Sequence, residues 1–342
     1  MKLVYQKDIW IKRSLVFLVL IIVPSLAINI YLIAKEKKLT VQKEKVPEQG
    51  NNNSLSIVRE TNNKEEFIKP LLLAEVNAES PRFALLKAEM NKFIEQRKKK
   101  GDVQSISIYL RDLNSTSWTD IGDSTEYYPG SLMKVPILIY FLRQEQTFPG
   151  TLKKEYFYEK PTGQFPVQTF LGDSILPGRS YSIAKLLWYM ITQSDNNATV
   201  LLSSHIDFGS YQQIFKDLNI PCDDLSSSQY MITPRQYSKF FRILYSSTYL
   251  SKDLSNYALK LLTECNFKSG LVKDLPAGLV VAHKFGERGV IGHAMDFSES
   301  GIIYSNSQPY LIVIMTRGND VRQLSTVVRD LSIEIFNQYK NI

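Results

Sequence analysis

Strand-like segments occur at both ends of the body of this chain, and mainly helical patterns lie between them. Because strands from both ends must pair to bury their apolar faces, we expect one antiparallel sheet in an α/β (α+β) fold. The helical middle, residues 182–264, then forms a subdomain, and a cleft between the two parts is the natural place for a site. The strands are expected at 105–112, 115–122, 278–285, 299–305 and 309–316.

Three further helices frame these strands. Apolar residues recur at helical spacing after Pro81, and this helix ends at the basic run before Gly101. A second helix begins near Ser131 and continues through an apolar stretch. The chain closes with a helix over residues 321–339.

Residues 14–34 form a run of 21 residues without a charge. At about 1.5 Å per helical residue, this run spans a hydrocarbon core of roughly 30 Å. Basic residues precede it, which favours a cytoplasmic tail over residues 1–13, although three lysines follow it as well. We prefer an uncleaved transmembrane signal anchor to a cleaved signal peptide, because the run is long and no small-residue cleavage site ends it. In both cases the body lies outside the cytoplasm.

Residues 35–78 are rich in Lys, Glu, Asn and Gln. A segment of this composition buries too little apolar surface to offset the entropy of ordering, so we predict a flexible linker. The body that follows, residues 79–342, is expected to be one domain.

The net charge of +7 is concentrated near the apolar run. Residues 1–69 hold 12 Lys/Arg against 7 Asp/Glu, whereas the remaining residues hold 29 against 27. Basic residues beside a membrane span set its orientation and meet anionic lipid. The charge therefore predicts a membrane partner through the N-terminal helix, and no nucleic-acid partner.

The cysteines and histidines indicate no metal site. Cys222 and Cys265 either pair outside the cytoplasm or remain two buried thiols, and the sequence leaves both interpretations open. His205, His283 and His293 are scattered without the ligand spacing of zinc sites. We interpret the last two as packed strand residues. No cofactor and no metal are expected.

A serine and a lysine are spaced three residues apart at the start of the second helix. Residues Ser131 and Lys134 then share a helix face, where a partly desolvated amine can lose its proton and act as a base for the hydroxyl. This S-x-x-K pattern is weak alone, since Ser182 and Lys185 match it as well. We interpret Ser182 as the N-cap of its helix.

A second short motif, Ser194-Asp195-Asn196, ends a predicted helix. These residue types also favour a plain turn between a helix and a loop. The chemical interpretation makes Ser194 a proton relay beside the leaving nitrogen and lets Asn196 bind the substrate amide. Asp195 then braces the loop.

A third motif, Lys284-Phe285-Gly286, lies in the first of the three closing strands. A lysine that points into a cleft can hold a substrate carboxylate, and a glycine lets the backbone approach the substrate closely. The motif means little by itself.

Taken in this order and in these structural contexts, the three motifs resemble the signature of class A β-lactamases and penicillin-binding proteins. The similarity covers roughly residues 80–340. It includes YYPGSLMKVPIL around Ser131, LPAGLVVAHKFG before and through Lys284, and ESGIIYSNSQPYLIVIMTRG near the end. The resemblance implies a β-lactamase/transpeptidase-like fold, with a five-stranded antiparallel sheet flanked by helices and an all-helical subdomain.

The resemblance also implies residue roles. Ser131 would attack a β-lactam or an acyl-D-alanyl amide and form an acyl-enzyme, and Lys134 would take its proton. Ser194 and Lys284 would assist the departing nitrogen. The oxyanion would lie between the backbone N–H groups of Ser131 and Glu287. Asn196 and Gly286 complete the substrate-binding set.

The sequence departs from that family in its third motif. Phe285 stands where the family has Thr or Ser, and a phenyl ring cannot donate to a substrate carboxylate. Arg288 or Arg317 would supply the positive group instead. An ordinary solvated surface charge is an equally good interpretation of either arginine.

A second departure concerns the glutamate that the family carries on its Ω loop. Residues 197–283 contain one glutamate, Glu264, past the expected place of the loop. The short stretch there offers only Asp223 and Asp224, which we interpret as turn or cap residues. Because loss of a general base costs about 10²–10⁴ in rate, a stable acyl-enzyme is expected more readily than rapid turnover.

The sequence thus predicts an exported, membrane-anchored serine hydrolase of the β-lactamase class A type. Its partner would be a small-molecule β-lactam or a peptidoglycan peptide. Two alternatives stay open: a D,D-peptidase or penicillin-binding protein, and a non-catalytic tethered binding or sensor module on the same fold.

Overall fold

The computed structural model describes most of the body of the chain. The described residues are 55–61, 70–160, 168–223, 225, 229–289, 294–305 and 308–340. The predicted cytoplasmic tail and transmembrane anchor lie outside them. Within the described part, no helix is both long enough and apolar enough to cross a membrane.

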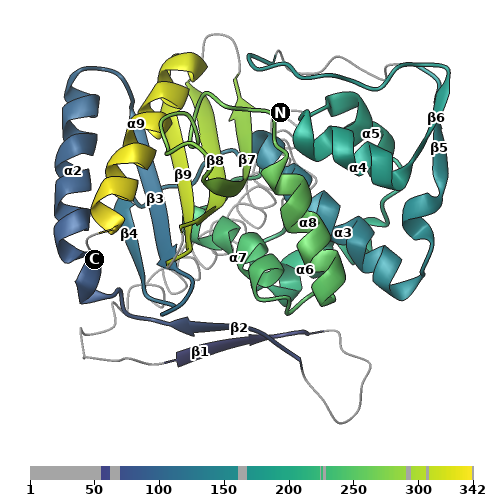
Figure 1. The fold of residues 1–342 in the computed structure, drawn as a ribbon, viewed down its shortest axis with the longest axis horizontal. Coiled ribbons are helices and arrows are strands. Elements are labelled where there is room, and N and C mark those ends of the chain that lie inside the picture. Colours follow the sequence, from purple (N-terminus) through teal and green to yellow (C-terminus); the bar gives the residue numbers. More distant parts are fainter. Residues whose placement is uncertain are drawn as a thin grey trace, which may run out of the picture. The chain divides into compact units, whose positions relative to one another are not determined.

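The centre of the fold is a five-stranded antiparallel sheet in the order β4-β3-β9-β8-β7 (Figure 1). Strand β3, the first strand of this sheet in the chain, hydrogen-bonds to β9, the last strand of the chain. The expected sheet of N- and C-terminal parts is therefore confirmed. Its strands are β3 (Ser105–Asp112), β4 (Trp118–Gly122), β7 (Val280–Arg288), β8 (Met295–Tyr304) and β9 (Tyr310–Gly318).

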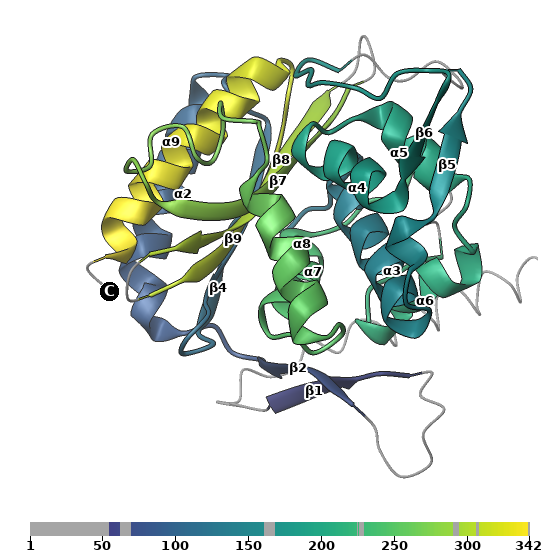
Figure 2. The same cartoon turned by 45° about the vertical axis from the view of Figure 1, so that its right-hand side comes forward.

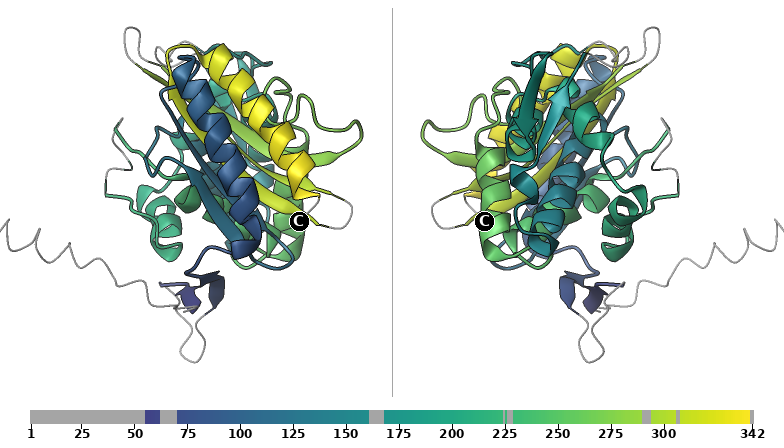
Figure 3. Two further views of the ribbon diagram at one scale, coloured as in Figure 1. Left: turned by 90° about the vertical axis from the view of Figure 1, so that its left-hand side faces the viewer. Right: turned by 90° about the vertical axis from the view of Figure 1, so that its right-hand side faces the viewer.

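Two helices from opposite ends of the chain cover one face of the sheet. They are α2 (Ala84–Lys99) and α9 (Val321–Tyr339), which lie side by side (Figure 3). Alternation along β9 divides the core, because successive side chains of a strand point to opposite faces. Ile312 packs with the apolar residues of α2 and α9, whereas Val313 packs with those of the helical part.

Six helices form the other part of the domain, on the opposite face of the sheet (Figure 2). The Ser182 hydroxyl accepts from the backbone N–H of Lys185, so its predicted role as an N-cap is confirmed. The helices are α3 (Lys134–Thr147), α4 (Ile183–Thr192), α5 (Asn196–Ser203), α6 (Phe208–Asp217), α7 (Pro234–Tyr245) and α8 (Lys252–Thr263). Short 3-10 turns are η1 (Pro81–Phe83), η2 (Gly130–Met133) and η3 (Thr151–Lys153).

A β-hairpin precedes the sheet in the chain. Strands β1 (Leu55–Arg59) and β2 (Leu71–Val76) pair antiparallel, and β2 contacts α7. Leu72 and Leu73 are buried in the core, and Glu75 forms a buried ion pair with Arg242 of α7. The predicted flexible linker is therefore wrong for the described residues between 55 and 78. Leucines within the polar segment provide the apolar surface that orders it.

The sequence patterns also missed a short two-stranded ribbon. Strands β5 (Glu155–Tyr158) and β6 (Arg179–Ser182) pair antiparallel beside the helical part. Each has four residues and is largely exposed, so neither shows the apolar alternation that marks a strand buried on one side.

Both cysteines are free and buried. Cys222 belongs to the core on the helical side of the sheet, and Cys265 to the core beneath α2 and α9. Of the two interpretations left open by the sequence, two buried thiols is the correct one. His283 is a buried residue of β7, with Nδ1 at 2.7 Å from Glu299 Oε1, as expected for a packed strand residue. His293 lies outside the described residues.

Candidate active site

The serine and lysine of the first motif lie at the start of α3. Ser131 is half-buried in the turn η2, and Lys134 is the first residue of α3. The backbone N–H of Lys134 donates to the carbonyl of Ser131, so the intervening turn is hydrogen-bonded. Residues three apart in such a turn project from one face. The hydroxyl and the amine thus share a face of this helix.

The Lys134 amine reaches the second motif. Its Nζ donates to the carbonyl of Ser194 at 2.5 Å, to Ser194 Oγ at 3.1 Å and to Asn196 Oδ1 at 2.9 Å. Burial lowers the pKa of Lys134 well below 10.5, and the charge of Lys284 lowers it further. An amine held in this way is neutral at a lower pH than an ordinary lysine, which is what a general base requires.

The lysine of the third motif also contacts Ser194. Lys284 is fully buried on β7, and its Nζ donates to Ser194 Oγ at 2.9 Å and to the carbonyl of Phe285 at 3.1 Å. Burial lowers the pKa of Lys284 to about 8. The structure thus brings the side chains of Lys134, Ser194, Asn196 and Lys284 together, with Ser131 one helical turn away.

The loop that carries Ser194 is held in place by contacts of the next residue, Asp195. Ser194 has a φ of 55°, in the left-handed region that non-glycine residues rarely adopt. Asp195 caps α5, and its carboxylate also accepts from Ser174 Oγ at 2.8 Å and from the N–H of Ile175 at 3.0 Å. These contacts agree with the predicted bracing role of Asp195, and they offset the cost of the strained serine.

Two glycines allow the turn η2 to pack closely against β7. A Cβ on Gly286 would lie 2.7 Å from the backbone nitrogen of Leu132, and one on Gly130 would lie 2.9 Å from the carbonyl carbon of Glu287. Real Cβ atoms do not approach backbone so closely. Gly286 was expected to admit a substrate, but the structure gives it a role in seating the turn that carries Ser131.

Glu287 has a contact that the sequence did not suggest. Its carboxylate oxygen Oε1 accepts from the backbone N–H of Thr169 at 2.9 Å and of Phe170 at 3.2 Å. These residues belong to the bridging segment, residues 168–175, which also bonds to Asp195. The bridging segment therefore links the loop of the second motif to β7. No pattern in the sequence marks it.

Comparison with known proteins agrees with this geometry. A family model described as the β-lactamase enzyme family matches residues 85–339, most of the chain. The chain belongs to this family. No curated protein resembles it closely enough in sequence to count as a relative.

Solved structures support the fold of this β-lactamase family member. A structure of PBP-A is 20% identical, with a TM-score of 0.60 over 74% of this chain and 97% of that one. A β-lactamase from Chitinophaga pinensis is 17% identical, with a TM-score of 0.62 over 73% and 99%. The TLA-3 extended-spectrum β-lactamase is 16% identical, with a TM-score of 0.63 over 74% and 99%. At these identities the likeness concerns the fold alone.

The aromatic residue of the third motif is a core residue in this family member. Phe285 is almost fully buried and stacks on Phe267, with ring centroids 4.2 Å apart. Phe170 of the bridging segment lies against both, at 4.7 Å from Phe267 and 6.0 Å from Phe285. Phe285 thus provides packing where the family pattern has a hydroxyl group.

The two arginines proposed as substitutes for that hydroxyl differ. Arg317 forms a two-pronged ion pair with Asp296, at 2.7 and 2.8 Å, and also donates to the carbonyl of Glu126. The Arg317 guanidinium is thus engaged by a carboxylate of the protein itself. Arg288 lies with its guanidinium carbon 4.1 Å from the ring centre of Tyr128, three residues before Ser131.

The acidic residues considered as deacylation bases lie in unsuitable places. Glu264 is an exposed residue at the end of α8, where it accepts from the indole N–H of Trp188. Asp223 is exposed as well, and Asp224 lies outside the described residues. The described part of the chain therefore places none of these carboxylates against the Lys134–Ser194–Lys284 cluster.

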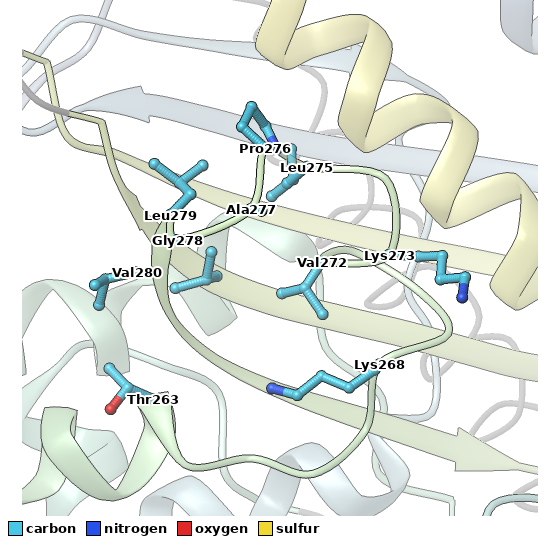
Figure 4. A pocket seen from close by; sticks show the side chains of 11 residues that line it. Thr263, Lys268, Val272, Lys273, Leu275, Pro276, Ala277, Gly278, Leu279 and Val280 are labelled. Carbon is cyan, nitrogen blue, oxygen red and sulfur yellow. The ribbon is translucent and has the colours of Figure 1, made fainter.

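Two cavities lie on the segment between α8 and β7. One, of about 580 Å³, is lined largely by aliphatic side chains such as Val272 and Leu279, and by none of the motif residues (Figure 4). The other, of about 340 Å³, has Phe285, Phe267 and the bridging segment among its lining. Only the second cavity adjoins the residues of the candidate site.

Proposed function

We propose that this protein is an exported, membrane-anchored acyl-transfer enzyme of the penicillin-binding type, acylated at Ser131 by a β-lactam or by a peptidoglycan amide. The observation that carries the proposal is the buried Lys134 amine. It stands one helical turn from Ser131 and shares the Ser194 hydroxyl with Lys284. A purely binding module needs no buried amine of lowered pKa beside a serine.

These residues can carry out every proton transfer that acylation of Ser131 requires. Ser131 Oγ attacks the carbonyl carbon while its proton passes to the neutral amine of Lys134. The C–N bond then breaks, and the departing nitrogen takes the proton of Ser194 Oγ. Lys134 returns its own proton to Ser194, so the amine is neutral again at the end. The products are an ester on Ser131 and a free amine.

The oxyanion of the intermediate needs two donors near Ser131. The backbone N–H groups of Ser131 and Glu287 meet this need, since the N–H groups at a helix start lack partners within the helix. Support comes from Gly130 and Gly286, which let the two backbones pack closely. Loss of one such donor typically costs about 10²–10³ in rate.

Hydrolysis of the acyl-enzyme is expected to be slow. It requires a base that activates water on the far side of the ester. Glu264 hydrogen-bonds to Trp188, and Asp223 is exposed to solvent. This arrangement favours a D,D-peptidase or penicillin-binding role over a rapid β-lactamase.

The second candidate function is a tethered, non-catalytic binding module. The observation in its favour is Phe285, which replaces the hydroxyl of the third motif and is packed beneath the bridging segment. The retained Lys134, Ser194, Asn196 and Lys284 cluster argues for the enzyme.

The test is covalent labelling of the full-length protein with saturating fluorescent penicillin, with mass spectrometry to locate the adduct. We expect one adduct, on Ser131, that persists for hours and is absent from Ser131→Ala. Absence of any adduct from the native protein would favour the binding module. Repeated turnover of a chromogenic cephalosporin would instead favour a true β-lactamase.

The membrane anchor is a separate part of the proposal and rests on the uncharged run over residues 14–34. After alkaline extraction of cell membranes, the full chain should stay in the membrane pellet. A chain that lacks residues 1–34 should appear in the soluble fraction. Release of the full chain would contradict anchoring without affecting the acylation chemistry.

A further inference from the structure

The two faces of the hairpin β1–β2 differ in what they contact. On one face, Val58 and Leu73 pack with the helical part of the domain. Glu75 of the same face pairs with Arg242. The neighbouring residues along each strand point the other way, as the period of a strand requires. This opposite, outer face consists of Leu55, Ile57, Arg59, Leu71, Ala74 and Val76.

The outer face is apolar and exposed. Leu55, Ile57 and Leu71 are 58%, 51% and 46% exposed. The irregular register at the end of β1 pairs Arg59 with Leu71, so Leu71 joins the face that Leu55 and Ile57 begin. A single exposed leucine is ordinary on a protein surface, whereas three aliphatic side chains on one face of a hairpin indicate contact with another apolar surface.

The described part of the chain does not provide that surface. The hairpin is a separate two-stranded sheet, and Figure 1 shows it at one side of the domain, with no helix or strand of the described residues beyond it. It also precedes residues 85–339, which the β-lactamase family model matches. The hairpin is thus an addition to the family domain, and its outer face is no part of the candidate active site.

The position of the hairpin in the chain indicates which surface covers it. Residues 35–54 separate the predicted anchor from β1, and these 20 residues span at most about 70 Å when fully extended. They contain five lysines against three glutamates, and a basic surplus beside a membrane span is attracted to anionic lipid. The hairpin is therefore the first described element after the predicted anchor, and its place in the chain keeps it within reach of the bilayer.

The charges of the hairpin also fit a lipid surface. Glu75 is the only acidic residue in the two strands, and it points inward to Arg242. Arg59 adds a basic group to the outer face. Aliphatic side chains next to a basic group, without a carboxylate among them, are typical of protein surfaces that lie in the headgroup region of a bilayer.

We propose that the outer face of the hairpin docks on the lipid surface of the membrane that holds the anchor. This inference rests on the proposed anchor and is independent of acylation at Ser131. The inner face is fixed to the domain by Leu73 and by the buried pair of Glu75 with Arg242. Docking therefore gives the domain one orientation toward the bilayer, which a tether alone does not impose.

The experiment places an environment-sensitive dye on single added cysteines of the full-length protein, reconstituted in vesicles of equal parts phosphatidylcholine and phosphatidylglycerol. The native Cys222 and Cys265 are buried, so the folded protein is labelled at the added thiol. At Leu55→Cys and Ile57→Cys we expect a blue-shifted emission that lipid-borne spin labels quench, since the dye reaches the acyl chains. Leu176→Cys is the matched control and should show neither effect, because Leu176 is 52% exposed but lies just before β6, away from the hairpin (Figure 1).

A second measurement removes the apolar contact while the dye stays on the hairpin. With the dye at Leu71→Cys, the combined Leu55→Ser and Ile57→Ser changes should lower the ratio of docked to undocked protein by about tenfold or more, because two aliphatic side chains no longer gain from burial in lipid. A native melting temperature shows that the variant is folded.

Three outcomes decide between the explanations. Absence of quenching at both Leu55→Cys and Ile57→Cys in the vesicle-bound protein would overturn the inference. A blue shift that grows with protein concentration and resists lipid quenching would also overturn it, since a second copy of the chain would then cover the face. Release of the chain by alkaline extraction, with lipid quenching present before extraction, would refute the anchor alone and support the docking.

Discussion

Lys134 and Lys284, which are 150 residues apart in the chain, donate to one and the same hydroxyl oxygen, that of Ser194. Both amines are buried, and burial lowers the pKa of each. A hydroxyl that accepts from two amines keeps its own proton for a third partner. This relationship makes Ser194 the natural donor to a leaving nitrogen.

The first prediction concerns Lys134 as the base. Lys134→Met should lower the acylation rate constant by about 10²–10⁴. Lys134→Arg should do the same, because a guanidinium keeps its proton. In the native protein the rate should rise with pH along a limb well below 10.5, since burial lowers the pKa of Lys134 and the neutral amine is the active form.

The second S-x-x-K pattern supplies the control for this prediction. Lys185 lies over the Trp188 ring, with Nζ 3.9 Å from its centre, and takes no part in the site. The Lys185→Met variant should therefore be acylated by the penicillin at the native rate. Stopped-flow fluorescence with a penicillin measures all of these variants. A native rate in Lys134→Met would show that another group removes the Ser131 proton.

The second prediction concerns the stability cost of burying Lys284. Its pKa falls from 10.5 to about 8 on folding, so between these values the unfolded chain binds more protons than the native one. The free energy of unfolding, relative to Lys284→Met, should therefore rise as the pH increases from about 8 to 10.5. The rise should reach at most about 3 kcal/mol. Chemical denaturation of both proteins across this pH range measures the two free energies of unfolding. If the difference between them did not change with pH, the lowered pKa of Lys284 would be contradicted.

Much of the fold follows from periodicity and much of the site from motif order. The predicted closing helix over 321–339 matches α9, and the motif lysines meet at Ser194. Within α2 the pattern is less reliable, since the adjacent apolar residues Leu85 and Leu86 differ: Leu85 is exposed and Leu86 is buried. Spacing reports which residues share a face, not how the neighbouring elements cover that face.

The features that were missed depend on contacts between distant segments. Glu287 accepts hydrogen bonds from the bridging segment, more than 110 residues earlier in the chain. No sequence pattern near either partner predicts this contact. For the hairpin β1–β2, the polar composition predicts a linker instead. Its ordering comes from Leu72 and Leu73, which are buried beside α7.

The third prediction concerns the packing of the turn that carries Ser131. In Gly286→Ala the new Cβ would lie 2.7 Å from the nitrogen of Leu132, so the turn must shift. Overpacking of this kind costs about 1–3 kcal/mol, and displacement of the nucleophile should lower acylation as well. Gly209→Ala, near the start of α6, is the control, because its Cβ would meet nothing closer than 3.6 Å. Melting temperatures and penicillin labelling rates are measured for both variants. If Gly286→Ala matched Gly209→Ala in both, the close packing of the turn η2 against β7 would be ruled out.

The last prediction concerns whether the hairpin belongs to the domain. Glu75 of β2 and Arg242 of α7 form a buried ion pair, and Arg111 lies close enough to interact with both. Burial alone would raise the pKa of Glu75, but the charge and hydrogen bond of Arg242, together with the charges of Lys239 and Arg235, outweigh it and the pKa is lowered. The stabilisation from this pair is therefore complete at neutral pH and is lost as the pH falls below about 4.5 and through the folded-state pKa.

Glu75→Ala should lower the free energy of unfolding by about 3–5 kcal/mol, because it leaves buried arginine charges without their partner. Glu75→Met combined with Arg242→Met should recover most of the loss. Glu95→Ala is the control, since Glu95 pairs with Lys98 on the exposed side of α2 and should cost less than about 1 kcal/mol. Denaturant unfolding at pH 7 measures all three. If Glu75→Ala proved as mild as Glu95→Ala, the hairpin would be a loosely attached tether, as its composition first indicated.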